Sequence, residues 1–417
     1  MHRMARLSLP VLLSIASLLG CGESHEALDW NESVRAGLAD PDTLISDSLV
    51  VQSADGPVEV STGLSPYLLA GTTTRGGQEL RAETYLRWDV SSVPQGTVTE
   101  ASLTLYLQQV DLPGSGGGEF SLAMHEVTGA WGEDSLTAGN RPPTDAATIA
   151  SAIVDTLGIQ GGDSVIVLTD VFDAPGNEDF RRLIESWVTD SGTNRGVVID
   201  AAAGSAEGLL RFFSAEGLPA GFGTPFLTPL LVVETADTLL SFEAIQDAFL
   251  VTPMGGPPAI PDSLLLVSAG YAHRAAFRLD LEQLLGPSST ADPNLAVIRA
   301  VLRLRLEPGQ AWSLPAGQSF SLHAYEARID WSAADPVASA EVIERISTVT
   351  AHGGDPEIAI PIGTLMQDLV EGLDRDLLVL ANTEVQEAKS VLLRGALARE
   401  GRPRVEVEFV RLGGRLP

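Results

Sequence analysis

The feature that most constrains this chain is an internal repeat, because one order of residues occurs twice, 200 positions apart. Residues 120–131 (FSLAMHEVTGAW) align with residues 320–331 (FSLHAYEARIDW), and the two segments share the Phe-Ser-Leu start, the glutamate and the final tryptophan. A chain of 417 residues is also long enough for two domains or more. We therefore expect two copies of one fold, each with its own apolar core.

A strand pattern precedes each of these segments. Residues 98–107 (VTEASLTLYL) match residues 297–306 (VIRAVLRLRL), and leucines occupy every second position at the end of both. A period of two is typical of a half-buried strand. Arginines stand between the leucines of the second copy. The repeat therefore keeps its core face and changes its solvent face.

Each copy also contains one helix-like window. Apolar residues recur three and four positions apart over 180–188 and again over 362–373, which predicts one amphipathic helix in each copy. The other apolar segments are short, and Gly- and Pro-rich stretches connect them. We predict an all-β fold made of two tandem jelly-roll β-sandwich domains, each with one short helix. A parallel α/β fold would need a helix between most of the strands.

The predicted organisation has four parts. Residues 1–20 are a lipoprotein signal peptide, and the polar residues 21–40 are a tether. The first sandwich occupies residues 41–235 and the second, divergent copy occupies residues 236–417.

The only cysteine in the sequence, Cys21, predicts a membrane anchor. Arg3 and Arg6 precede the apolar run 7–19, which is the order of a secretory signal. The sequence Leu-Leu-Gly-Cys that ends at Cys21 resembles the lipobox of bacterial lipoproteins, and this resemblance implies that Cys21 becomes the first residue and carries the lipid. An ordinary signal peptide with an incidental cysteine is the alternative. The run itself spans about 20 Å, which is too short for a membrane core of about 30 Å. We expect a protein of the cell envelope, lipid-anchored to a bacterial membrane, with the outer membrane or cell surface favoured.

Charge restricts the partners of the exported chain. Removal of residues 1–20 would remove two arginines and no acid, which leaves 24 basic and 55 acidic residues. Such a surface repels phosphate backbones, so nucleic acid is excluded as a partner. Because one cysteine cannot form a disulfide within the chain, both domains depend on apolar cores.

The first copy resembles a known family. Residues 87–94 (RWDVSSVP), 101–106 (ASLTLY), 131–142 (WGEDSLTAGNRP) and 212–216 (FFSAE) are similar to the DNRLRE-type domain, also classed as carbohydrate-binding module family 96. This resemblance implies a jelly-roll module of secreted and surface bacterial proteins, often beside polysaccharide-degrading enzymes, and it assigns no binding residues. The second copy departs from the pattern, with Leu279 in the place of Trp88 and no Asn-x-Pro after its tryptophan.

Catalytic motifs are missing from the sequence. It contains no Gly-x-Ser-x-Gly elbow, no phosphate-binding loop and no paired-cysteine metal site. His125-Glu126 begins like a zinc-protease motif, but Gly129 stands where the second histidine is needed. Glu133 and Asp134 could be an acid/base pair, calcium ligands or a solvated turn, and we favour the turn. We therefore predict no enzyme, no cofactor and no metal.

Aromatic residues are the candidates for sugar contact, because sugar rings stack on exposed aromatic faces. Trp131 and Trp331 recur at the same place in both copies, which favours a packing role. Trp88, Tyr106 and Tyr67 occur only in the first copy, and we predict that they form a carbohydrate-binding surface.

These features predict a surface-anchored, non-enzymatic lipoprotein that displays two β-sandwich modules, the first of which binds an extracellular polysaccharide. A structural or adhesion spacer without a sugar site is the main alternative. A polysaccharide lyase or hydrolase is a third. An open groove lined by aromatics would favour the first, and an arginine with paired carboxylates in a deep cleft would favour the third.

Overall fold

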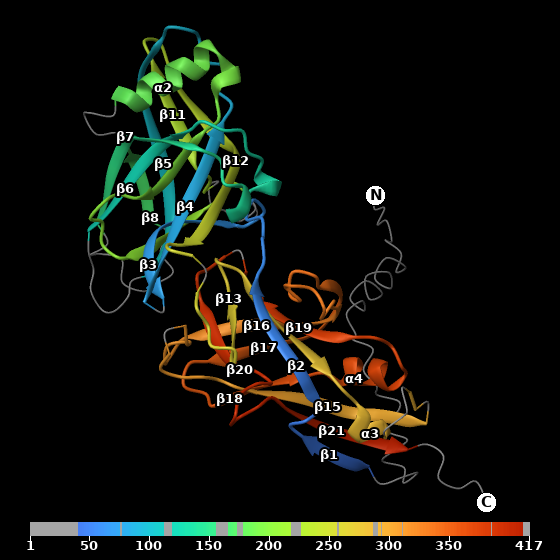
Figure 1. The fold of residues 1–417 in the computed structure, drawn as a ribbon. Helices are drawn as coiled ribbons and strands as arrows, with labels where there is room; N and C mark the ends of the chain where they lie inside the picture. The colour runs from blue at the N-terminus through green and yellow to red at the C-terminus, as the bar shows by residue number, and fades with distance from the viewer. Residues whose placement is uncertain are drawn as a thin grey trace, which may run out of the picture.

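A computed structural model describes residues 41–411 (Figure 1), apart from residues 76, 112–118, 156–165, 173–177, 218–226, 257, 287–290, 293, 311 and 385. The predicted signal peptide and tether, with Cys21, lie outside the described residues. Within the described part of the chain, no helix is long and apolar enough to cross a membrane.

The first sandwich is one continuous antiparallel sheet that closes on itself. Its strands are β3 (Tyr67–Arg75), β4 (Gln78–Trp88), β5 (Val98–Asp111), β6 (Glu119–Val127), β7 (Thr144–Asp155), β8 (Ile166–Val171), β9 (Val197–Ala201), β10 (Gly208–Phe213), β11 (Leu230–Thr235) and β12 (Leu239–Pro253). They run in the order β12-β11-β5-β10-β3-β4-β9-β6-β7, and β8 pairs with β5. Closure comes from β12, whose first half pairs with β11 and whose second half pairs with β4. The ladder shifts register between Ala244 and Gln246, where the strand passes from one partner to the other.

The period-two prediction for residues 98–107 is confirmed. Leu103, Leu105 and Leu107 of β5 are buried in the core of the first sandwich, while Tyr106 between them is half-buried. Helix α2 (Glu178–Thr189) covers one end of this sandwich (Figure 1), and all five of its predicted apolar positions are buried. Three short 3₁₀ helices, η1 (Glu133–Ser135), η2 (Ala138–Asn140) and η3 (Ser191–Thr193), lie in the connections.

The second sandwich has two antiparallel sheets. One contains β13 (Leu264–Ser268), β14 (His273–Leu279), β16 (Ser319–Arg328), β17 (Glu341–His352), β19 (Asp376–Ala381), β20 (Ser390–Arg394) and β2 (Val50–Pro57). The other contains β1 (Asp42–Ser46), β15 (Leu295–Arg305), β18 (Glu357–Pro361) and β21 (Arg404–Arg411). Helices α3 (Glu282–Leu285) and α4 (Gly363–Val370) complete it. The predicted helix window reaches Leu373, but α4 ends at Val370, and Leu373 is 42% exposed. The predicted class, an all-β pair of sandwiches, is confirmed.

The predicted domain boundaries need correction, because the sandwiches exchange strands. Strands β1 and β2 come from the start of the chain, yet β1 pairs with β21 and β2 pairs with β14 (Figure 1). Strand β12 begins the second sequence copy, yet it completes the first sandwich. A tight turn after β11 explains this, since the Thr235 N–H donates to the Thr238 carbonyl and folds β12 directly back onto β11. The first sandwich is thus made of residues 58–253, and the second of residues 42–57 and 264–411.

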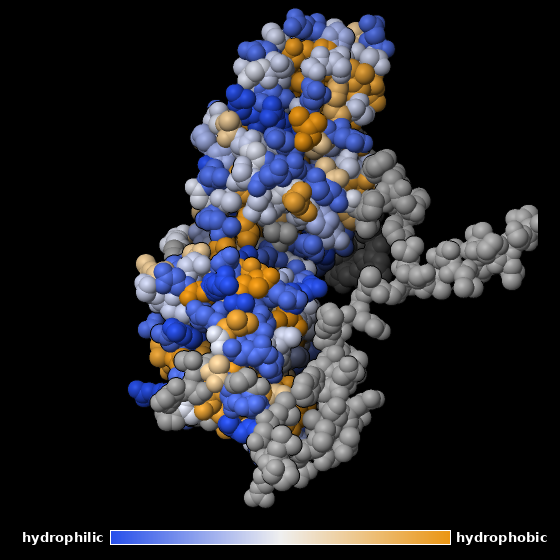
Figure 2. Space-filling view, turned by 90° about the vertical axis from the view of Figure 1, so that its right-hand side faces the viewer, coloured by the Kyte–Doolittle hydropathy of each residue, from blue (hydrophilic) through white to orange (hydrophobic). Residues whose placement is uncertain are grey.

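The exchange is reciprocal. Residues 42–46 (DTLIS), which form β1, match residues 237–241 (DTLLS), whose last three residues open β12. In the second sandwich β1 pairs with the last strand, β21, and β2 pairs with β14, which ends at the buried Leu279. In the first sandwich β12 pairs with the last strand of the first sequence copy, β11, and then with β4, which ends at the buried Trp88. Each sequence copy therefore supplies its leading strand to the other copy. On the face shown in Figure 2, apolar residues are scattered among hydrophilic ones over both sandwiches.

Candidate functional site

The prediction that Trp88 contacts sugar is wrong. Its side chain is 0% exposed, and its indole N–H donates to the carbonyl of Pro229 at 3.4 Å. Trp88 shares the inward face of β4 with Leu86, and Leu279 at the matching place in the second copy is buried as well. The position therefore belongs to the core in both copies, and the Trp-to-Leu difference is a change of core packing.

Tyr67 and Tyr106 are both half-buried. The Tyr67 ring lies 5.7 Å from the Phe213 ring, and the Arg211 guanidinium stands 4.8 Å above it. Tyr106 is in register with Val167 of β8. Neither tyrosine lines the groove described below. Their role as sugar contacts stays a prediction.

The packing role predicted for the two repeated tryptophans matches their contacts. Trp131 packs against Tyr85 with ring centroids 5.8 Å apart, and its indole N–H donates to the Arg195 carbonyl at 2.8 Å. The Trp331 N–H donates to Asp376 Oδ1 at 3.0 Å. Both rings cover the outer face of their sheets, next to small apolar clusters separate from the main cores.

A groove of about 630 Å³ is open on the outer face of the first sandwich. Strands β3, β4, β6, β7 and β9 and the turn after β9 form its walls. Alternation along the strands produces this face, because Leu80 and Ala82 point into the core while Glu79 and Arg81 point outward. The groove's polar lining includes Thr72, Thr74, Arg81, His125, Thr148 and Asp200, and the lining contains no Trp, Tyr or Phe among the described residues.

A chain of ion pairs fixes the floor of this groove. Arg81 pairs with Asp200, and its Nε lies 3.3 Å from Glu83 Oε1. Glu83 is completely buried and also pairs with Arg141 at 2.5 Å. Burial raises the pKa of the Glu83 carboxyl, and the two arginines oppose that shift. The Tyr85 hydroxyl accepts a hydrogen bond from Arg141 at 3.2 Å. These contacts hold Arg81 and Asp200 in one geometry.

Asp200 and His125 lie beside each other at the floor of the groove. Asp200 is 2% exposed, its Oδ2 accepts from Arg81, and its buried Oδ1 has no donor among the described residues. His125 Nδ1 lies 3.0 Å from the Ala147 carbonyl, so in the neutral ring the proton belongs on Nδ1 and Nε2 is an acceptor. Nε2 lies 3.8 Å from Asp200 Oδ1. A hydroxyl group is the natural donor to such a pair of acceptors.

The second sandwich lacks this arrangement. Strand registers and the 200-residue repeat place Ala272 at the position of Arg81, Tyr325 at that of His125 and Leu380 at that of Asp200. The polar groove is therefore specific to the first copy. Sequence reasoning missed Arg81 and Asp200, although the single charge inside the apolar strand at residues 197–201 and the alternating charges of residues 78–88 were a usable signal.

Comparison with known proteins supports the resemblance noted in the sequence. Residues 56–158 match carbohydrate-binding module family 96. The matched segment begins at the end of β2 and covers β3 to β7, so it contains the groove residues Arg81 and His125. The similarity of the first copy to this family of carbohydrate-binding modules is thus confirmed over that segment. The match starts at residue 56, close to residue 58, where the first sandwich begins.

No curated protein gives a significant match to this chain. Among solved structures, the N-terminal tandem CBM22-1–CBM22-2 domain of Paenibacillus barcinonensis Xyn10C aligns with 10% identity over 86% of this chain and 99% of that one, at a TM-score of 0.12. The Macrobrachium rosenbergii nodavirus structure aligns with 8% identity over 98% of this chain and 96% of that one, at a TM-score of 0.11. TM-scores this low do not establish a shared fold, and the fold assignment rests on the strand pairings.

Proposed function

We propose that this protein is a non-enzymatic lipoprotein of the bacterial cell envelope, anchored through Cys21, which binds an extracellular polysaccharide in the groove of its first sandwich. The second sequence copy supplies β12, which closes the first sandwich. The anchor proposal rests on the signal sequence that ends at Cys21. The sugar proposal rests on the groove.

One observation carries the binding proposal. Asp200 Oδ1 is buried without a donor beside His125 Nε2, at the floor of an open groove in a segment similar to carbohydrate-binding modules. A buried acceptor without a donor is costly, and a sugar hydroxyl would supply the missing hydrogen bond. Threonine hydroxyls around it, at positions 72, 74 and 148, add further hydrogen-bonding groups.

The lining favours a neutral polysaccharide. Glu79, Asp200 and Glu207 contribute three carboxylates against the single guanidinium of Arg81, and the whole chain has a formal net charge of −29. A polyanionic chain would be repelled by this field. Without an aromatic platform in the lining, binding would depend on hydrogen bonds to sugar hydroxyls instead of ring stacking.

The enzyme alternative fits the groove less well. A lyase or hydrolase needs an arginine or carboxyl free to act on the substrate. Arg81 is already engaged by Glu83 and Asp200, and these same contacts hold both carboxylates in place. The spacer alternative gives no reason for a donor-free buried acceptor in an open groove.

The test uses matched substitutions in the two copies. Thr148→Trp places a bulky ring in the groove, and Thr348→Trp places the same ring at an exposed position of β17 in the second sandwich. Glycan-array screening followed by calorimetry on the mature chain should find one neutral polysaccharide that Thr348→Trp still binds and Thr148→Trp does not. Asp200→Asn should weaken binding at least about tenfold, because a charged acceptor is lost. Equal binding by both tryptophan variants would move the site elsewhere, and no binding at millimolar glycan would favour the spacer.

A further inference from the structure

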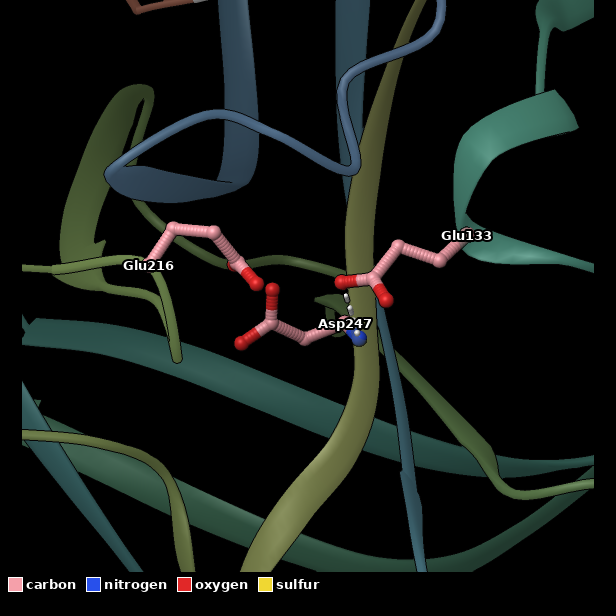
Figure 3. Close-up of side chains that lie close together, drawn as sticks. All are labelled: Glu133, Glu216 and Asp247. Carbon is pink, nitrogen blue, oxygen red and sulfur yellow. Dashed lines mark hydrogen bonds between the residues drawn. The ribbon is translucent and has the colours of Figure 1, made fainter.

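Three carboxylates from distant parts of the sequence meet in the first sandwich (Figure 3), and none of them lines the groove. Glu133 belongs to η1, Glu216 follows β10, and Asp247 lies on β12. One carboxylate oxygen from each lies within 4.8 Å of the other two. Figure 3 shows the three side chains pointing toward one another from different elements. Asp134, the neighbour considered as a partner of Glu133 in the sequence, is not part of this cluster.

Asp247 gives a second, independent observation. Asp247 is 1% exposed, and its Oδ2 accepts a hydrogen bond from the Ala215 N–H at 2.6 Å. Its Oδ1 is buried and has no hydrogen-bond donor among the described residues. In Figure 3 one Asp247 oxygen points between the carboxylates of Glu133 and Glu216, whereas its other oxygen points away from them. A buried anionic oxygen that faces two other anions needs a positive partner.

The position of Glu133 is enforced by its surroundings. Its Oε1 accepts from the Asp247 N–H at 3.2 Å, and its carbonyl accepts from the Ser61 hydroxyl at 2.9 Å. Gly63 approaches so closely that a Cβ atom there would lie 2.3 Å from Glu133 Cγ. Any larger residue at position 63 would displace the carboxylate. The local packing therefore directs Glu133 toward the other two acids.

The second sandwich shows that the fold does not require these acids. The Ala396 N–H donates to Ser53 of β2 at 2.8 Å, in the same way that the Ala215 N–H donates to Asp247 of β12. Ser53 thus replaces Asp247. Because Ala396 corresponds to Ala215, Leu397 occupies the position of Glu216 in the second sandwich. The 200-residue repeat places Ala333 at the position of Glu133. All three carboxylates are absent together from the copy that lacks the polar groove.

We propose that Glu133, Glu216 and Asp247 form a calcium-binding site in the first sandwich. Calcium takes hard oxygen ligands at about 2.3–2.6 Å, so two ligand oxygens on one ion lie at most about 5 Å apart. The 4.8 Å limit of this cluster fits that reach. The cluster contains no histidine or cysteine, which zinc prefers. Glu216 is exposed, so water can complete the coordination that calcium requires.

Crowding of the acids agrees with this assignment. Burial, and then the nearby Glu216 and Glu133, raise the pKa of Asp247 to about 8. A divalent cation would offset the repulsion and would link η1, the turn after β10 and β12. Because β12 comes from the second sequence copy, the ion would fasten the exchanged strand to the sandwich that it completes. A proton shared between Asp247 and Glu216 is the competing explanation.

The test measures calcium binding by the mature chain after chelation. Addition of CaCl₂ should raise the midpoint of thermal unfolding of the first sandwich by about 5–10 °C at about 100 times the dissociation constant. MgCl₂ at the same concentration should give a much smaller rise, since magnesium demands near-ideal octahedral geometry. Calorimetry should give one calcium site per chain.

Matched variants distinguish calcium binding at the three clustered acids from nonspecific binding of calcium to an acidic protein. Glu216→Gln alters an exposed turn residue and should fold normally, yet it should weaken calcium binding at least about tenfold. Asp247→Asn should abolish the calcium-induced rise and leave the calcium-free protein at least as stable as the wild type. Asp134→Asn, one residue from Glu133 and outside the cluster, should behave as the wild type. Equal midpoints with calcium and with chelator would overturn the proposal in favour of the shared proton, as would a loss of response in Asp134→Asn equal to that in Glu216→Gln.

Discussion

The reciprocal exchange of strands predicts which fragments of this chain can fold. A fragment of residues 41–235, cut where the sequence copies meet, retains β1 and β2, whose partners β21 and β14 are missing. It also loses β12, which pairs with both β11 and β4 and closes the sheet. A fragment of residues 58–256 lacks the unpaired strands β1 and β2 and keeps β12. We expect the second fragment to fold and the first to remain largely unfolded.

The loss can be estimated from the buried side chains of β12. Phe249, Leu250 and Val251 are each at most 4% exposed. Full burial of such a side chain contributes about 1.5–3 kcal/mol, so the three together contribute about 5–9 kcal/mol. A domain of this size is stable by only about 5–15 kcal/mol. The ladder with β4, from Ala244 to Pro253, would be lost as well. Removal of β12 is therefore enough to unfold the sandwich.

Far-ultraviolet circular dichroism and urea titration of the two fragments test this expectation. Residues 58–256 should give a β-rich spectrum and one cooperative transition, and residues 41–235 should give neither. Addition of a peptide covering residues 237–256 to the shorter fragment should restore β structure, since it supplies the missing strand. The reasoning would be refuted if residues 41–235 unfolded at the same urea concentration as residues 58–256.

Two further predictions concern the anchor and a buried acid. Cys21→Ser should leave a soluble or uncleaved protein, because the thiol is the only lipid attachment point in the sequence; a processed, lipid-bearing Cys21→Ser protein in the detergent phase would contradict the anchor. Burial, and then the nearby Asp368, raise the pKa of Glu326 to about 7, so the folded state binds a proton that the unfolded state releases near pH 4.5. The free energy of unfolding should therefore fall by up to about 3 kcal/mol as pH rises from 4.5 to 7, and Glu326→Gln should remove that dependence and be the more stable protein at pH 8. Parallel stability curves for the two proteins between pH 4.5 and 8 would exclude this role for Glu326.

The sequence predicts the fold class and the elements well because both depend on local periodicity. Leucines at every second position place the core face of β5, and apolar residues three and four positions apart place α2. The exchange was missed because a strand's periodicity does not specify its partner. The repeated DTLIS and DTLLS segments were a usable signal that β1 and β12 are equivalent, but the tight turn at Thr235 decides where β12 goes.

The candidate sites were predicted poorly for a related reason. Aromatic residues were chosen by type and by their absence from the second copy, yet Trp88 faces the core because it shares the inward face of β4 with Leu86. The groove depends on Arg81 and Asp200, which are 119 residues apart and meet only through the pairing of β4 with β9. No spacing within one segment reveals such a pair.

The same long-range assembly limits what the family-matched segment can do alone. Residues 56–158 carry Arg81, His125 and Glu133, but Asp200, Glu216 and Asp247 all come from later in the chain. The donor-free acceptor of the groove and two of the three clustered acids therefore lie outside the match. Asp247 lies further still, on a strand that by sequence belongs to the second copy. The second copy has diverged from the first, yet it keeps its leading strand, β12. The first sandwich cannot close without β12, and the proposed calcium site cannot form without Asp247.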